Sequence, residues 1–209
     1  MTMDMGTYKV EPLFAEPIFR AGIGHAITDE QVNFIKSLKM VPNQTNLISE
    51  NLYIFDEPEL GSIKHAVHEL LSAYARDVMG ITQDLYVTQS WALRNDPGTG
   101  MHGHSHSNSI ISGSLYFDEL PEPNSGMIFD RHRIYQQIQL NPEMDKRNIF
   151  NTHLNVIYPQ SKEVMLFSSS LQHLVEANRS NVPRWSIAFN TFVRGELGDY
   201  RNVSRLKLG

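Results

Sequence analysis

The 209-residue sequence contains no cysteine. This absence excludes disulfide bonds, thiolate metal sites and a cysteine nucleophile, and it is compatible with a reducing cytoplasm. No stretch approaches the roughly 18 apolar residues that a membrane-spanning helix requires. The first residues, MTMDMGTYKV, lack the basic and apolar pattern of a signal peptide. We therefore expect a cytoplasmic protein with no membrane partner.

Basic residues are outnumbered by acidic ones: the chain has 18 Lys and Arg against 23 Asp and Glu, which gives a formal net charge of −5. Proteins that bind nucleic acid by neutralising phosphates carry clusters of basic residues, and this chain has no long one. The composition therefore argues against nucleic acid as a partner. Hydrophobic residues make up 41% of the chain, which is enough to bury the core of a single domain over residues 1–209.

The first 80 residues are expected to form a helical support. Thr28 and Gln31 have the spacing of a capping box, which predicts a helix over 29–40. A second helix is predicted over about 57–79, where apolar residues recur at helical spacing, and Gly80 suits its C-terminal end. Residues 10–23 are predicted to be an extended strand. The two helices are also a candidate surface for a homodimer.

Beyond Gly80 the sequence changes to short β-forming runs that alternate with turn-forming residues. Such spacing is typical of a β-sandwich or barrel. We therefore predict a mainly β fold of about eight strands over 81–195, with the N-terminal helices packed on its outer face and a C-terminal tail over 196–209. Residues 131–152 are expected to form a long loop. The runs that predict strands are 85–95, 110–120, 126–130, 153–159, 163–169, 173–177 and 184–195.

Histidines occupy every second position in "MHGHSHS". In an extended chain His104 and His106 point to the same side, and histidine is the commonest metal ligand. His173, in a later β-forming run, is a candidate third ligand. Three protein ligands leave coordination positions open for chemistry. His102 is expected to lie outside the ligand set.

The last predicted strand, "RWSIAFN", has one small and polar face. Arg184, Ser186, Ala188 and Asn190 share this face, while the bulky apolar residues between them are predicted to pack on the helices. A face of this kind lines a cavity for an anion, and a guanidinium can bind a carboxylate bidentately.

The predicted strand "IISGSLYF" has a similar polar face formed by Ser112, Ser114 and Tyr116. Gly113 between them is expected to let neighbouring backbone approach.

With these residues, the sequence resembles the iron(II)- and 2-oxoglutarate-dependent oxygenases of the double-stranded β-helix (jelly-roll) fold. It is most similar to a branch common in bacteria and phages that carries a His-x-His … Ser-Gly-x-x-Tyr signature. The stretches that carry the resemblance are "PLFAEPIF", "HSHSNSIISGSLYF", "GMIFD" and "EVMLFSSSLQHLVEANRSNVPRWSIAFN".

The resemblance implies a reaction that consumes 2-oxoglutarate and O₂, releases succinate and CO₂, and hydroxylates a substrate that the sequence does not identify. It implies Fe(II) as the metal, with ligands at His104, His106 and His173. It also implies that Arg184, with Ser186, holds the distal carboxylate of 2-oxoglutarate. Tyr116, Ser112 and Asn190 are further candidate contacts of this cosubstrate.

One position departs from the wider family, whose usual metal triad is His-x-Asp … His. His106 stands where the aspartate is expected, and the spacing of Asp130 does not suit a replacement. Three neutral imidazoles leave more positive charge on the metal than two imidazoles and a carboxylate, which can change oxygen reactivity or favour another metal.

Two alternative functions remain open. Gly98 and the His104-x-His106 pair match the opening of a cupin signature, which would indicate a different metal-dependent dioxygenase or isomerase. The glutamate expected a few residues later is missing, because Ile110 and Ile111 occupy those positions. The barrel could instead be a non-catalytic module with a structural metal, although a closed site needs a fourth protein ligand and none is evident.

Overall fold

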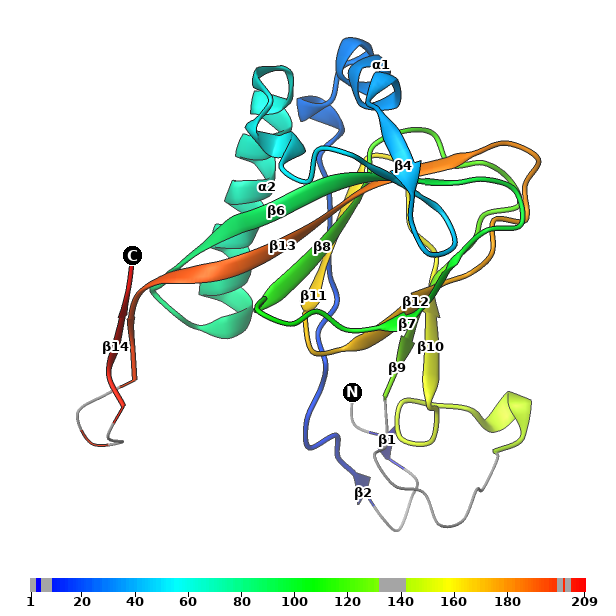
Figure 1. Ribbon diagram of the computed structural model, residues 1–209. Coiled ribbons are helices and arrows are strands. Elements are labelled where there is room, and N and C mark those ends of the chain that lie inside the picture. Colours follow the sequence, from blue (N-terminus) through cyan, green and yellow to red (C-terminus); the bar gives the residue numbers. More distant parts are fainter. Residues whose placement is uncertain (1–2, 5–8, 132–141, 199–200, 202–203) are drawn as a thin grey trace.

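The computed structural model describes the whole chain except residues 1–2, 5–8, 132–141, 199–200 and 202–203 (Figure 1). Its strands form a large and a small antiparallel sheet, which pack face to face, and a separate two-stranded ribbon. This arrangement confirms the predicted jelly-roll architecture. No helix in the described ranges is long and apolar enough to cross a membrane.

The large sheet has the strand order β3-β11-β8-β13-β6-β5-β4, with β14 paired to the far end of β13. The small sheet has the order β10-β9-β12-β7, and β1 pairs only with β2. Strands of the large sheet are β3 (Phe19–Gly22), β4 (Met40–Pro42), β5 (Leu47–Ser49), β6 (Asp84–Asn95), β8 (Ile111–Tyr116), β11 (Glu163–Ser168), β13 (Arg184–Leu197) and β14 (Leu206–Leu208). The other strands are β7 (Met101–His104), β9 (Met127–Asp130), β10 (Leu154–Ile157), β12 (Gln172–Val175), β1 (Met3–Asp4) and β2 (Lys9–Val10).

Two helices precede the long strands, as predicted. Helix α1 (Asp29–Ser37) begins with the predicted capping box, in which Thr28 and Gln31 bond each other's backbone N–H groups. Helix α2 (Gly61–Ala73) follows a short 3₁₀ turn and continues as a π-helix over Tyr74–Met79. Gly80 ends it with a φ of 66°, a left-handed conformation that glycine adopts without strain. The remaining 3₁₀ turns are Gly24–Ala26, Ile54–Asp56 and Met144–Lys146.

Helix α2 lies across the outer face of the large sheet (Figure 1). Its buried residues Val67 and Leu71 belong to the same hydrophobic cluster as Ile187 and Phe189 of β13. The bulky face of the predicted strand at 184–190 therefore packs outwards on the helical layer, as expected from its alternation. The small and polar face of β13 is left for the space between the sheets.

Several boundaries differ from the sequence-based prediction. Of the expected strand at 10–23, only Val10, which ends β2, and Phe19–Gly22 lie in strands, and only Phe19–Gly22 joins the large sheet, by pairing with β11. The β4–β5 hairpin was not predicted, and it makes the first 80 residues more than a helical support. The expected tail also contributes a strand, since β14 pairs with Gly195–Leu197. Of the loop expected at 131–152, residues 132–141 lie outside the described residues, and the described remainder contains no strand and one 3₁₀ turn.

Candidate active site

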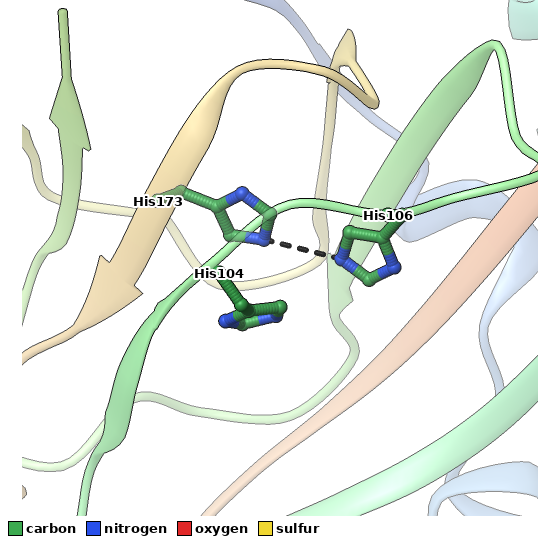
Figure 2. A group of neighbouring side chains, drawn as sticks. All are labelled: His104, His106 and His173. Atoms are coloured by element: carbon green, nitrogen blue, oxygen red, sulfur yellow. Dashed lines mark hydrogen bonds between the residues drawn. The ribbon is translucent and has the colours of Figure 1, made fainter. Parts of the chain in front are cut away.

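Three histidines converge between the sheets (Figure 2). His104 ends β7 and lies directly across from His173 on the neighbouring strand β12. His106 follows two residues later, beyond the end of β7. One ring nitrogen from each histidine lies within 4.8 Å of the others, and the Nε2 atoms of His106 and His173 are 3.3 Å apart. Among the described residues, no other cluster of three or more His, Cys, Asp or Glu side chains could hold a metal ion.

Backbone carbonyls orient two of the three imidazoles. Nδ1 of His104 lies 2.8 Å from the carbonyl oxygen of His102, and Nδ1 of His173 lies 2.9 Å from that of Leu171. A carbonyl oxygen only accepts hydrogen bonds, so Nδ1 carries the proton in both rings and Nε2 keeps its lone pair. This is the tautomer in which Nε2 can bind a metal.

Burial keeps two of the rings neutral. It lowers the pKa of His106 to about 4, and the nearby His173 and His104 add to the effect. Burial also lowers the pKa of His173 to about 4. Because a metal ligand must be deprotonated, these two imidazoles are ready to coordinate at neutral pH.

A network of buried hydroxyl groups fixes the loop that carries His106. The backbone N–H of His106 donates to the carbonyl oxygen of Ser169, 2.9 Å away. The Ser169 side chain is fully buried and lies 2.7 Å from Oγ of Ser109 and 2.8 Å from Oγ of Ser112. Ser112 in turn donates to Oδ1 of Asn190 at 2.9 Å.

This network changes the interpretation of two residues that the sequence suggested as cosubstrate contacts. Asn190 does not line the cavity, and Ser112 lines it but already bonds Asn190 and Ser169. Sequence reasoning missed Ser109 and Ser169. The sequence around the metal motifs is rich in serine, but nothing in it indicates which serines form the network.

A cavity of about 300 Å³ opens between the sheets and includes all three histidines. Arg184 reaches it from β13 and is only 3% exposed. Its Nη1 donates to the carbonyl oxygen of Ser125 at 2.8 Å, while its buried Nε has no partner. No carboxylate in the described parts of the chain pairs with this guanidinium. A buried cation without an anion is costly, so the site is suited to a bound carboxylate.

Tyr116 and Ser186 lie close to Arg184. The guanidinium carbon of Arg184 is 5.9 Å from the centre of the Tyr116 ring, and both Tyr116 and Ser186 line the cavity. Burial raises the pKa of Tyr116, while the Arg184 cation lowers it by a smaller amount. The hydroxyl therefore stays protonated at neutral pH and is able to donate a hydrogen bond. The other predicted residues of this face, Ala188 and Ser114, also line the cavity.

Gly113 has a different neighbour from the one expected. A Cβ atom built there would lie 2.1 Å from Cζ of Phe189, its cross-strand partner. The missing side chain of Gly113 therefore makes room for the ring of Phe189, whereas the sequence predicted that it makes room for neighbouring backbone. The Phe189 ring in turn contacts Phe55, with 5.6 Å between ring centres.

One family of known proteins matches the part of the chain that carries this site. The sequence profile of the family described as "Putative 2OG-Fe(II) oxygenase" matches residues 89–190, a range that contains the three histidines and Arg184. A search of curated proteins finds no match.

Solved structures share the fold at low sequence identity. HygX from Streptomyces hygroscopicus, with nickel and 2-oxoglutarate bound, has a TM-score of 0.58 at 13% identity, over 84% of this chain and 82% of its own. A Pseudomonas putida prolyl-4-hydroxylase has a TM-score of 0.58 at 13% identity, over 86% and 94%. An oxidoreductase of the 2OG-Fe(II) oxygenase family from Burkholderia pseudomallei has a TM-score of 0.58 at 11% identity, over 83% of each chain.

A jelly-roll with a histidine cluster and a buried arginine in one cavity has the features that a non-haem metal oxygenase requires. Residues 89–190 match the family described as putative 2OG-Fe(II) oxygenases, a description that names iron(II) and 2-oxoglutarate. The residues present fit both groups. Imidazoles with free Nε2 lone pairs suit the metal, and the orphaned Nε of buried Arg184 suits a carboxylate.

Proposed function

We propose that this oxygenase holds Fe(II) with His104, His106 and His173, and holds the distal carboxylate of 2-oxoglutarate with Arg184. Iron with 2-oxoglutarate and O₂ supplies the oxidising power to hydroxylate a C–H bond, with release of succinate and CO₂. The observation that carries the proposal is the unpaired guanidinium of Arg184, which is buried in the same cavity as the three histidines.

The chain's own residues bind and orient the cosubstrate. Arg184 offers charge-assisted hydrogen bonds to one end, and Tyr116 and Ser186 are placed to add neutral ones. Met127 and Phe167 give this part of the cavity an apolar wall, which excludes water and strengthens the ionic contact. Ser112 serves mainly to hold the His106 loop through Ser169.

An anaerobic titration tests the cosubstrate assignment. Adding Fe(II) and 2-oxoglutarate together should produce a weak visible charge-transfer band. Arg184→Ala should lose the band because it loses the carboxylate contact, and His173→Ala should lose it because it loses the metal. If the intact protein gives no band, the cosubstrate assignment is wrong.

A second test asks whether His106 is a ligand in place of the usual aspartate. His102 provides a matched control, because it lies two residues before His104 but outside the converging cluster. His106→Ala should weaken Co(II) binding at least about 100-fold in a calorimetric titration, whereas His102→Ala should bind as the native protein does. Equal affinity of both variants would show that His106 does not bind the metal.

The two alternative functions are less well supported. A cupin-type reaction has no use for the buried cation of Arg184, and a structural metal site would need a fourth ligand beside the three histidines. Succinate release that depends on metal would exclude both. A cytoplasmic location, the lack of a nucleic-acid partner and a possible homodimer stay predictions, and sedimentation analysis would settle the last.

A further inference from the structure

The cavity has a second half, on the side of the large sheet away from Tyr116. The inner face of β13 carries small side chains after Arg184, and the facing residues belong to β6. Neighbouring pairs across these two strands are Arg184 with Asn95, Ser186 with Leu93, and Ala188 with Trp91. The wall therefore changes from polar at Arg184 to an indole beside a methyl group at Ala188.

Trp91 lies where this second half meets the metal site. Its ring is stacked with the imidazole of His106, with 6.5 Å between ring centres and 27° between planes. Its cross-strand neighbour Ala188 is small and also lines the cavity. A flat apolar group can therefore lie against the indole within reach of the metal ligands.

The β4–β5 hairpin completes the second half. Ile48 of β5 pairs with Leu93 and extends the apolar wall. The hairpin loop places Asn43 and Gln44 on the cavity lining, and Gln44 is exposed, so these amides lie at the opening. Thr45 ties the loop to the segment before β7 by donating from Oγ1 to the carbonyl oxygen of Gly100 at 2.6 Å.

The amides at the opening form an uncharged hydrogen-bonding rim. Asn43 donates to Oδ1 of Asn46 at 3.0 Å, and Asn46 donates to Oδ1 of Asn95 at 3.3 Å. The Gln44 amide makes no hydrogen bond within the described part of the chain. A side-chain amide both donates and accepts hydrogen bonds, so this uncharged rim can bind a neutral polar group.

The charges of the cavity select against a cationic substrate. No Asp, Glu or Lys occurs among the described residues that line it, and its one Arg is Arg184. Fe(II) with three neutral imidazoles, the Arg184 cation and the 2-oxoglutarate dianion leave an excess of roughly one positive charge. A cation would lose its hydration and meet repulsion, with no carboxylate to compensate.

We propose that this second half of the cavity binds an uncharged substrate, with an aromatic or apolar group against Trp91 and an amide-like group at the rim. This proposal rests on the function proposed above. Trp91 and the β4–β5 hairpin are then the determinants of substrate class. The reacting C–H bond belongs to the part of the substrate that lies between Trp91 and the histidines.

Three probes of nearly equal shape test this proposal: benzamide, benzamidinium and benzoate. The protein is loaded with Zn(II) and 2-oxoglutarate, which fill the metal site and the Arg184 half without turnover. Benzamide should bind at least about 10-fold more tightly than benzamidinium, as measured by calorimetry. It should also bind more tightly than benzoate, because the positive charge lies at the metal and Arg184, and the neutral amides of the rim offer a carboxylate no cation in exchange for its hydration. In Trp185→Phe, where Trp91 is the one tryptophan left, benzamide should quench the fluorescence.

Two variants separate a stacking role from general damage. Trp91→Ala should weaken benzamide binding about 10-fold, while Trp91→Phe should keep most of it and Trp185→Phe all of it. Tighter binding of benzamidinium or benzoate, or native-like binding by Trp91→Ala, would overturn the proposal. Failure of 2-oxoglutarate to bind the Zn(II) protein would instead refute the proposed function, because that step precedes any probe.

Discussion

Replacing Arg184 by methionine should make the protein more stable and deprive it of its cosubstrate at the same time. The native guanidinium is 3% exposed and lacks an anionic partner, and burial of an unpaired cation costs several kcal/mol. Methionine fills a similar volume without charge. The variant also loses the bond to the Ser125 carbonyl, which costs about 1–3 kcal/mol. A net gain of about 1 kcal/mol should remain, and it should raise Tm by about 2–4 °C.

The response to 2-oxoglutarate should change in the opposite direction. For the native Zn(II) protein, ligand at 100 times its Kd should add about 2.7 kcal/mol of stability, or about 5–11 °C in Tm. Loss of one partner of a buried, hydrogen-bonded charge pair costs about 2–5 kcal/mol of binding, which is about 30-fold or more in Kd. At the same ligand concentration the Arg184→Met protein should therefore gain less than about 1 kcal/mol.

Thermal unfolding with and without 2-oxoglutarate measures both effects in one experiment. Arg194→Met is the matched control, because Arg194 lies on the same strand but is exposed and stacks on Tyr86. This control should keep the native response to 2-oxoglutarate. A native-sized Tm shift in Arg184→Met would refute the assignment of Arg184, whatever its effect on the metal.

Three further outcomes follow from the site and its supports. The metal-free protein should lose stability as pH falls from 6.5 towards 4. Because the pKa of His173 is about 4 in the folded protein and 6.5 in the unfolded chain, the unfolded chain binds a proton at a higher pH than the folded protein does. Urea titrations should show a loss of about 3 kcal/mol from this group. Ser169→Ala should weaken Co(II) binding about 10-fold, whereas Ser170→Ala, which alters an exposed hydroxyl pair, should not. Gly113→Ala should lower the free energy of unfolding by about 1–3 kcal/mol through its clash with Phe189, as chemical denaturation would reveal.

The convergence of the candidate site residues could be predicted from the sequence, because it follows from strand alternation and from the spacing of the histidines. Alternation placed Arg184 and Ser186 on an inward face, and spacing made His104, His106 and His173 candidate ligands. The ends of β13 were predicted to within two residues, because its sequence is strongly β-forming even though its pairing partners lie far away in the chain.

The features that were missed depend on contacts that no local pattern encodes. The strands of the β4–β5 hairpin have three residues each and little periodicity of their own, and they are defined by the pairing of β4 with β5 and of β5 with β6. Asn190 lies on the predicted face, yet its amide bonds Ser112 because β8 and β13 are adjacent. Neither the order of strands in the sheet nor the bonding partner of a buried serine can be read from spacing alone.

The β4–β5 hairpin lies entirely before residue 89, where the match to the oxygenase family begins. The hairpin half of the proposed substrate pocket thus lies outside the matched stretch, whereas Trp91 and the three histidines lie inside it. Substitutions in the hairpin, residues 40–49, change one wall of the cavity without changing the three histidines or Arg184, so this segment is a suitable site for engineering substrate preference.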